Sequence, residues 1–312
     1  MNTQFNNLTR FGEYLQIKGY TKSSAESSVQ LVNYFAQWAA TQNIYDMTEV
    51  SYSDVLAFIQ YCNERNVSKK TQVVYVRHLN HYYNFLRSEE GVKDNPASHI
   101  KIKGVKRKVM HQLLNPAELD SVYRNYPVTI ERKEGVNMPP QERNEMARKR
   151  NKVILGLLIY QGLNSGEIAS LRTSDVKQQE GRIYVPSKKR SNSRMLKLEA
   201  HQLYDMMEYI STTRKKQLER ANVETDKLFI NERGAKKFFC MLQSLLNFIR
   251  KQNSKIKNLE QIRASVITQW VKQYDLRKAQ YLAGHKYVRT TEGYKQNNMD
   301  ELKADIKNFH PF

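Results

Sequence analysis

The residues with the clearest chemical potential lie near the end of the chain, where a histidine and a tyrosine stand nine positions apart. His285 follows Gly284, and glycine commonly ends helices because it tolerates left-handed backbone. Tyr294 follows two adjacent threonines, and its hydroxyl can act as a covalent nucleophile once a binding site activates it. In a chain of 312 residues with a formal charge of +20, this pattern points to phosphoryl transfer on nucleic acid.

Neither residue type is diagnostic by itself. The chain contains 19 tyrosines, and most tyrosines in proteins are core or surface residues. Gly-His pairs are common at helix ends, where a histidine interacts favourably with the helix dipole. The interpretation therefore depends on the elements that would position these two side chains.

Composition narrows the classes of partner. Lys and Arg outnumber Asp and Glu by 51 to 31, which predicts a polyanion as partner and leaves an anionic membrane surface as the alternative. No run of roughly eighteen apolar residues occurs, so we expect no transmembrane helix. Cys62 and Cys240 are isolated, which predicts buried thiols in a reducing cytoplasm. No Cys/His cluster has metal-ligand spacing and no glycine-rich phosphate loop occurs, so we expect neither a metal nor a cofactor.

The first hundred residues predict a small all-helical domain. Cap segments at residues 20–24 and 68–71 precede apolar residues at helical spacing, and strand patterns are absent. Residues 101–112 predict a basic linker, because five of the eight residues from Lys101 to Lys108 are cationic. Such a segment stays extended unless a nucleic-acid backbone neutralises it; an ordinary solvated hinge is the alternative.

Residues 113–312 predict a second domain. It begins at Asn115, an N-cap that Pro116 and Glu118 follow in a capping-box pattern. The segments that follow are predicted in chain order as a polar surface loop (131–149), an apolar helix (151–160), a strand (182–186), a basic turn, a return strand (195–198) and further helices. The predicted fold class is therefore mainly α, with an all-helical first domain and a helical second domain that carries one small antiparallel sheet.

This domain order, the basic hairpin turn and the carboxy-terminal Leu-Ala-Gly-His turn with its following tyrosine resemble the tyrosine recombinase (phage integrase) family. The resemblance implies a helical domain that clamps DNA and a helical catalytic domain. It also implies site-specific cleavage and rejoining of DNA strands through a 3′-phosphotyrosyl intermediate. That bond conserves the energy of the phosphodiester, so no cofactor is implied.

The resemblance assigns a role to four residues of the second domain. Tyr294 matches the nucleophile, and Arg263 matches the second of two arginines that hold the scissile phosphate. A guanidinium can bond two phosphate oxygens at once, whereas a lysine cannot. His285 matches the histidine that hydrogen-bonds the phosphate. Glu167 matches a structural acid that orients the arginines, and an exposed helix glutamate is the alternative.

A lysine and two departures complete the expected site. Lys188 matches the turn lysine that protonates the departing 5′ oxygen, with the adjacent Lys189 as the alternative. Asn164 stands where the family has its first arginine, and Glu260 stands where it has its first histidine. Losing one preorganised donor typically slows an enzyme by ~10²–10³. Glu260 repels a phosphate when ionised, and it could serve when protonated or as a base toward Tyr294.

Two explanations of these departures remain open. Either another cation fills the gap, for which Arg148, Arg150 and Arg172 are candidates, or the protein is an accessory DNA-binding factor that cleaves slowly or not at all. DNA relaxation without synapsis, as in a type IB topoisomerase, is a third option. The resemblance favours strand exchange.

The expected partners are double-stranded DNA and further copies of the chain. Candidate DNA-binding residues are Lys69, Lys70, Arg77, Lys106, Arg107 and Lys189. The residues of the first domain could instead form a solvated basic face. The tail 295–312 has one apolar stripe, formed by Met299, Leu302, Ile306 and Phe309. The resemblance implies that this tail docks into a neighbouring protomer of a dimer or tetramer on DNA; packing onto its own domain is the alternative.

Overall fold

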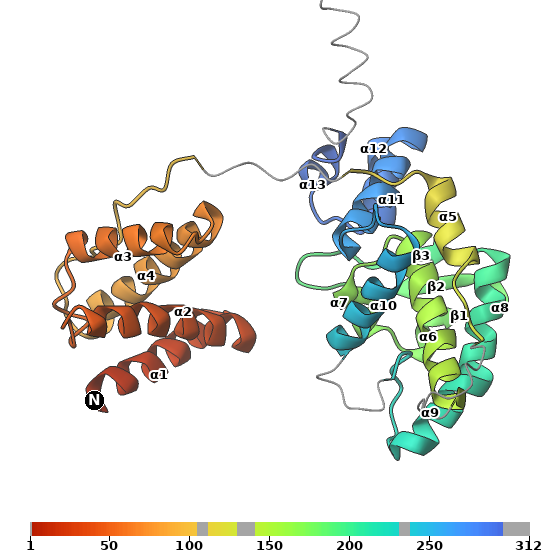
Figure 1. Cartoon of the computed structure of the whole chain (residues 1–312), viewed down its shortest axis with the longest axis horizontal. Coiled ribbons are helices and arrows are strands. Elements are labelled where there is room, and N and C mark those ends of the chain that lie inside the picture. The colour runs from red at the N-terminus through yellow and green to blue at the C-terminus, as the bar shows by residue number, and fades with distance from the viewer. Residues whose placement is uncertain (1, 105–111, 130–140, 231–237, 296–312) are drawn as a thin grey trace, which may run out of the picture. The chain divides into compact units, whose positions relative to one another are not determined.

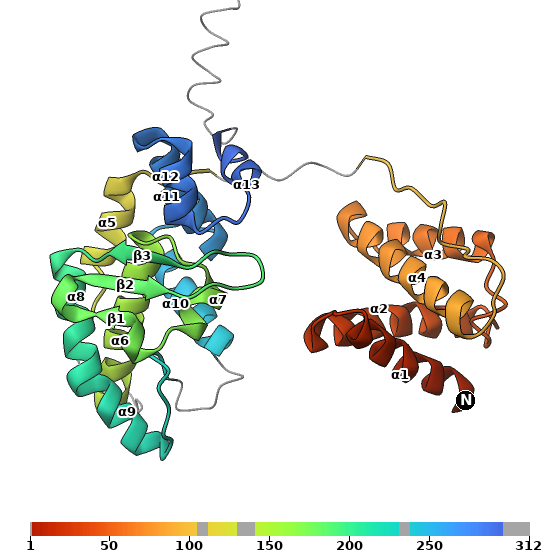
Figure 2. The same ribbon diagram turned by 180° about the vertical axis from the view of Figure 1, so that it is seen from behind.

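The computed structural model divides into two compact units, Met1–Val109 and Met110–Phe312. It describes residues 2–104, 112–129, 141–230 and 238–295. Figures 1 and 2 show the helices and strands of each unit.

The first unit is helical throughout its described elements. These are α1 (Asn2–Ile17), α2 (Lys22–Thr41), α3 (Tyr52–Glu64) and α4 (Lys69–Glu89). Polar caps define three of the helix starts: Thr21 accepts from the backbone of Ser24, Ser51 forms a capping box with Asp54, and Ser68 caps α4. Each cap satisfies a backbone donor that the first helical turn leaves without an intrahelical partner.

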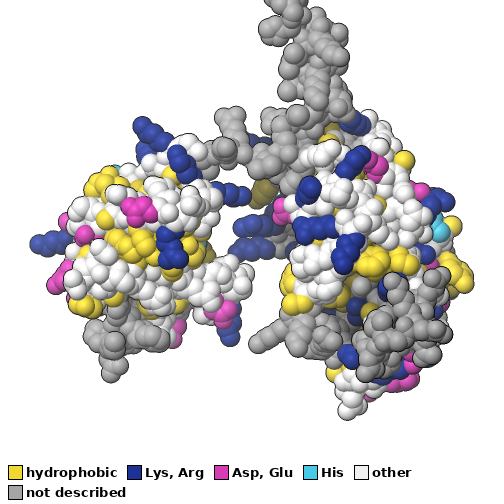
Figure 3. All heavy atoms as spheres, in the orientation of Figure 1, with side chains coloured by type: hydrophobic (Ala, Val, Ile, Leu, Met, Phe, Trp, Pro, Cys, Tyr) yellow, Lys and Arg dark blue, Asp and Glu magenta, His cyan; other side chains and the backbone are white. Residues whose placement is uncertain are grey.

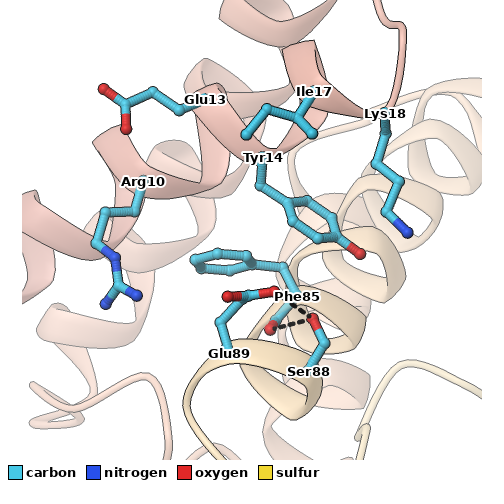
Figure 4. Close-up of a pocket in the computed structure, with 8 residues that line it drawn as sticks. All are labelled: Arg10, Glu13, Tyr14, Ile17, Lys18, Phe85, Ser88 and Glu89. Atoms are coloured by element: carbon cyan, nitrogen blue, oxygen red, sulfur yellow. Dashed lines mark hydrogen bonds between the residues drawn. The ribbon is translucent and has the colours of Figure 1, made fainter.

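Aromatic side chains form the interior of the first unit. Phe58 lies edge-on to Phe35 with ring centroids 5.0 Å apart, and Phe11 contacts Tyr82 in the same geometry at 5.2 Å. Figure 4 shows the Tyr14 ring of α1 next to the Phe85 ring of α4. The centroids of these two rings are 5.2 Å apart. Large apolar rings with edge-on contacts therefore hold these helices together.

The second unit contains most of the regular elements. In chain order they are α5 (Pro116–Arg124), α6 (Gln141–Ile159), α7 (Ser165–Ser170), η1 (Thr173–Asp175), β1 (Val176–Lys177), η2 (Gln178–Glu180), β2 (Arg182–Val185), β3 (Arg194–Lys197), α8 (Ala200–Glu208), η3 (Tyr209–Thr213), α9 (Arg214–Ala221), α10 (Phe238–Gln252), α11 (Leu259–Gln273), α12 (Leu276–Ala283) and α13 (Val288–Glu292). The segment η3 is a single π-helical turn between α8 and α9. Asn115 and Glu118 form the expected capping box at the start of α5.

The three strands form one small antiparallel sheet in the order β1-β2-β3 (Figure 2). Ile183 pairs with Val176 on one side and with Leu196 on the other. All three side chains belong to the buried cluster that also contains residues of α6, α10 and α11. The hairpin that joins β2 to β3 therefore projects from a sheet that is anchored in the core.

The predicted fold class is confirmed: the chain is mainly helical, with one small antiparallel sheet in the second unit. One predicted boundary was wrong, because α6 begins at Gln141, whereas the sequence predicted a loop over 131–149. Residues 131–140 lie outside the described residues. Met146, Arg150 and Val153 lie on the buried side of α6. Residues 141–149 contain only Met146 and Ala147 as apolar residues, which is too few to reveal the helical period.

Two negative findings apply only to the ranges given above. None of the helices there is both long and apolar enough to cross a membrane. No group of three or more His, Cys, Asp or Glu side chains there is placed to hold a metal ion.

Candidate active site

Glu167 is a fully buried carboxylate in the first turn of α7. Its backbone N–H donates to Asn164 Oδ1 at 2.8 Å, and the backbone N–H of Asn164 donates to Glu167 Oε2 at 3.0 Å. This reciprocal capping box explains the asparagine, because Asn is among the best N-cap residues. The Asn164 oxygen therefore holds the helix that carries Glu167.

Arg263, on α11, contacts the carboxylate of Glu167. Its Nη1 donates to the Gly162 carbonyl and lies 3.4 Å from Glu167 Oε2, while its Nη2 donates to the Ala283 carbonyl at 2.7 Å. The side chain is 13% exposed. Burial lowers the pKa of the Arg263 guanidinium, and the charge of Glu167 opposes that shift. Arginine titrates so far above neutrality that the group stays cationic.

Arg194, at the start of β3, is the site residue that the sequence reasoning missed. Its Nη1 donates to Glu167 Oε1 at 2.8 Å and its Nε donates to the Leu282 carbonyl at 2.8 Å. Strand alternation could have found it, because position 194 shares a face with Leu196, whose side chain is buried. A buried arginine needs hydrogen-bond acceptors, and those of Arg194 are the Glu167 carboxylate and the Leu282 carbonyl.

Glu167 is therefore held between two guanidinium groups. Burial alone raises the pKa of its carboxyl group. The hydrogen bond and charge of Arg194, followed by the charge of Arg263, outweigh burial and leave that pKa below its usual value. Glu167 is consequently ionised at neutral pH, and it forms ion pairs with both arginines.

Lys188 lies in the turn between β2 and β3. Its backbone exchanges hydrogen bonds with Ser191 at 2.8 and 3.1 Å, and its Nζ donates to the Gly166 carbonyl. Asn192, which follows Ser191, donates its backbone N–H to the Gly284 carbonyl at 3.0 Å. The lysine turn is thus fastened directly to the turn that carries His285.

The electrostatic environment of Lys188 suits a proton donor. Burial lowers the pKa of its ammonium group; the charge of Glu167 raises it and that of Lys227 lowers it further, with a net downward shift. A lowered pKa eases proton release to a leaving oxygen. Lys188 and Lys189 are both exposed residues of this turn. The bond from Lys188 to Gly166, beside Glu167, favours Lys188 over Lys189 for the predicted role.

His285 and Tyr294 lie next to each other. Their rings are stacked, with centroids 5.6 Å apart and planes 16° apart. His285 Nδ1 lies 2.9 Å from the hydroxyl of Thr291, a residue of α13 that is fully buried. Because that bond occupies one ring nitrogen and fixes the ring plane, Thr291 orients the imidazole against Tyr294.

The surroundings of the Tyr294 hydroxyl favour its protonated form. Burial raises its pKa; the charge of Arg263 lowers it and that of Glu260 raises it again, with a net upward shift. Glu260 is exposed in the first turn of α11. The predicted nucleophile is therefore neutral at neutral pH, and a base must accept its proton during attack.

The three cations proposed to fill the gap at Asn164 have other partners. Arg148 donates to a backbone carbonyl at 3.3 Å, and Arg150 donates to a different one at 3.0 Å. Arg172 pairs with Asp226 at 2.8 Å. The second cation on Glu167 is instead Arg194.

The predicted DNA-binding residues of the first unit lie on α4. Lys69 and Lys70 are exposed in its first turn, and Arg77 is exposed two turns later on the same side as Lys70. Figure 3 shows Lys and Arg side chains gathered on the visible faces of both units. Lys106 and Arg107 lie outside the described residues, as do residues 296–312 of the tail.

Comparison with known proteins covers nearly the whole chain. Residues 137–301 match the phage integrase family, and residues 8–92 match the N-terminal SAM-like domain of phage integrases. Tyrosine recombinase XerC of Anoxybacillus flavithermus is 26% identical over 308 residues, covering 97% of both chains. Tyrosine recombinase XerD of Oceanobacillus iheyensis is 24% identical over 306 residues, covering 96% of this chain and 97% of its own.

Solved structures share the fold at lower identity. The Tn1549 transposon integrase in complex with transposon right end DNA has a TM-score of 0.63 at 15% identity, covering 97% of this chain and 99% of its own. The XerH site-specific recombinase bound to difH substrate has a TM-score of 0.63 at 19% identity, covering 90% of this chain and 79% of its own. Since the family match at 137–301 spans more than half of the sequence, the chain belongs to the phage integrase family.

Proposed function

We propose that the protein is a site-specific DNA recombinase that cleaves and rejoins strands through a 3′-phosphotyrosyl intermediate. One observation carries the proposal: the ring of Tyr294 is stacked on His285, beside a buried ion cluster that includes Arg263. The similarity to tyrosine recombinases over both units supports it.

The proposed reaction is a direct displacement at phosphorus. The Tyr294 oxygen attacks the scissile phosphate, a bond forms between that oxygen and phosphorus, and the bond from phosphorus to the 5′ oxygen breaks. Lys188 gives its proton to the departing 5′ oxygen. Arg263 and His285 stabilise the negative charge on the pentacoordinate phosphate. Attack by a 5′ hydroxyl from another strand reverses the chemistry and joins the two strands.

The proton of Tyr294 also needs an acceptor. Glu260 is the proposed base, because its charge already acts on the Tyr294 hydroxyl. It occupies the position at which the resemblance predicts a histidine. A carboxylate can accept the proton, but while ionised it also repels the substrate phosphate. This opposition predicts slower cleavage than a histidine would give.

Double-stranded DNA is the proposed substrate, and the structural neighbours solved with DNA support this. Lys69 and Lys70 are proposed to contact phosphates at the start of α4, where the helix dipole favours anions. Arg77 is proposed to reach base edges from the same exposed side. Lys106, Arg107 and Lys189 are proposed as further backbone contacts.

Self-association on DNA is proposed to involve the tail 295–312. The second unit has a cleft of about 340 Å³ that could receive an apolar segment from another protomer. Its lining includes Leu119, Ile159, Val266 and Trp270. Deleting residues 296–312 should leave single-site DNA binding intact and abolish the larger complex on two-site DNA, as measured by light scattering. An unchanged complex mass would exclude the tail.

The function is tested by trapping the covalent intermediate. DNA sites selected from a random library by binding are nicked close to the cleavage position, so that the short leaving strand diffuses away. The wild-type protein should form an adduct that survives denaturation, and Tyr294→Phe should form none while retarding DNA equally. Retarded DNA without an adduct from the wild type would contradict the proposal and favour an accessory DNA-binding protein.

A further inference from the structure

Arg194 makes two contacts that no role assigned so far explains. Its side chain is 0% exposed, as is the Glu167 carboxylate to which it is bonded. Burying a cation is costly unless it is paired and hydrogen-bonded, and replacing such a pair with apolar residues is often stabilising. Stability alone is therefore a weak explanation for an arginine at this strand position.

The first reason is the charge balance of the buried cluster. Glu167 accepts from Arg194 on Oε1 and from Arg263 on Oε2. Two cations and one anion leave a net charge of +1. Without Arg194, Glu167 would cancel the charge of Arg263, and Lys188 would be the one uncompensated cation among the charged groups that face this carboxylate. A first arginine at position 164 would restore that charge, but Asn164 carries none.

The second reason is the anchoring of the turn before His285. Arg194 Nε bonds the Leu282 carbonyl, and Arg263 Nη2 bonds the next carbonyl, that of Ala283. These carbonyls lie in the last turn of α12, where backbone acceptors lack intrahelical donors and the dipole favours cations. The two arginines therefore hold adjacent carbonyls of the helix end that leads into His285.

Gly284 is shaped to fit this guanidinium. Its φ of +67° is a left-handed conformation that favours glycine. A Cβ added there would lie only 2.7 Å from Arg194 Cζ and 3.1 Å from its Nε, and still closer to Nη1. The glycine of the Gly-His turn thus leaves the space that Arg194 fills.

We propose that Arg194 is a positioning residue of the active site: by matching the charge of Glu167 and anchoring the turn before His285, it lets Arg263 present a net positive charge to the scissile phosphate despite the neutral Asn164. This inference rests on the proposed function. Arg194 does not touch the phosphate; it acts through Glu167, Arg263 and the α12 turn.

The test is a charge cycle on the covalent step. Wild type, Arg194→Met, Glu167→Gln and the double variant are compared by the single-turnover rate of adduct formation at saturating nicked DNA. Arg194→Met should slow the reaction by about 10²-fold, the effect of losing one preorganised charged group. The double variant should recover about tenfold of that loss, because removing both charges restores the net +1. A double variant as slow as Arg194→Met, or slower, would overturn the proposal.

Two further variants separate charge from packing. Arg194→Lys keeps the charge but loses the planar fork, so its rate should fall between those of the wild type and Arg194→Met. Arg182→Met changes an exposed arginine of the neighbouring strand and should leave the rate unchanged. If Arg194→Lys is as slow as Arg194→Met, the charge-balance argument fails.

The cycle also distinguishes failure of this inference from failure of the proposed function. If the wild type forms no adduct, the proposed function is wrong and Arg194 has no positioning role in catalysis. The four proteins are then compared by urea unfolding. If the losses of unfolding free energy in the two single variants do not add up to the loss in the double variant, the ionic linkage between Arg194 and Glu167 is supported. Additive losses would overturn that linkage as well. An active wild type with no recovery in the double variant would overturn only the inference.

Discussion

The interiors of the two units differ in kind. Among the described residues, the buried polar side chains of the first unit are the neutral Ser28 and Gln72, set among aromatic rings. The interior of the second unit contains four buried charged residues: Arg150, Glu167, Arg194 and Arg214. Buried ions are weak evidence for stability, whereas apolar packing is its main source. The first interior therefore serves the fold, while two of these four ions, Glu167 and Arg194, lie at the candidate site.

The largest expected effect comes from truncating one buried group in each unit. Phe58→Ala should destabilise the first unit by about 3–5 kcal/mol through the cavity it leaves. Glu167→Ala should cost the second unit about 3–5 kcal/mol for a different reason, because it leaves buried Arg194 without its anion. Urea titration can separate the units, because the chain has 2 tryptophans, Trp38 in the first unit and Trp270 in the second. Replacing either with Phe leaves the other as reporter. A Glu167→Ala cost below about 1 kcal/mol would remove the contrast between the interiors.

A matched pair of glycines sharpens the same contrast. Gly19 of the first unit and Gly284 of the second both have left-handed backbone, with φ of +82° and +67°. A Cβ at Gly19 meets nothing within 4 Å, so Gly19→Ala should cost only the backbone strain of about 1–2 kcal/mol. Gly284→Ala adds a collision with Arg194 and should also slow adduct formation by about 10²-fold. If both substitutions lowered the free energy of unfolding equally and neither slowed adduct formation, the role given to the α12 turn would be contradicted.

Acid should destabilise the second unit selectively. The folded-state pKa of Glu167 lies below its unfolded value of about 4.3. The ionised carboxylate therefore makes its full contribution to the stability of the second unit above that value. It is lost as the pH falls through the folded pKa. The charged groups that face Glu167 are Arg194, Arg263 and Lys188, all cationic in this range. Glu167→Gln should therefore flatten the loss of stability below about pH 5, measured by Trp270 fluorescence. An unchanged slope would show that other carboxylates dominate.

The smallest expected effect lies on the surface of the first unit. Lys70→Ala should weaken DNA binding modestly and reduce the slope of log affinity against log salt by about 1. The rate of adduct formation at saturating DNA should stay unchanged, because α4 is proposed to position DNA without taking part in the chemistry. Gel retardation over a salt series measures the slope. A changed rate at saturation would break the assignment of affinity to the first unit and chemistry to the second.

Much of the fold could be predicted from the sequence because local signals and long-range packing agree. The predicted cap segments 20–24 and 68–71 and the predicted cap Asn115 each begin a helix, with Thr21, Ser68 and Asn115 as the N-caps. The strand predicted at 182–186 is β2, over Arg182–Val185. The two-residue strand β1 was missed because so short a segment carries no alternation. The start of α6 was missed because residues 141–149 contain only Met146 and Ala147 as apolar residues.

Part of the candidate site could likewise be predicted from sequence motifs, and part could not. The tyrosine, the histidine, the second arginine and the turn lysine carry recognisable motifs, and their predicted roles stay predictions until an adduct is sought. Arg194 has no motif, and the predicted return strand, 195–198, began one residue after it. Only its register beside Leu196 revealed an inward position. The anion that makes burial tolerable, Glu167, is 27 residues away in sequence, so their pairing depends on tertiary structure.

The capping box at Asn164 constrains how the site can change. The same Glu167 side chain closes the box, pairs with Arg194 and pairs with Arg263. An arginine introduced at position 164 would remove the α7 cap and add a further cation beside a carboxylate that already has two. Substitutions at 164 and 194 should therefore show strong epistasis. A change at position 164 should be harmful while Arg194 is present, and a change at position 194 should be harmful while Asn164 is present. Directed evolution toward faster cleavage should recover them as linked pairs, and rarely as single steps.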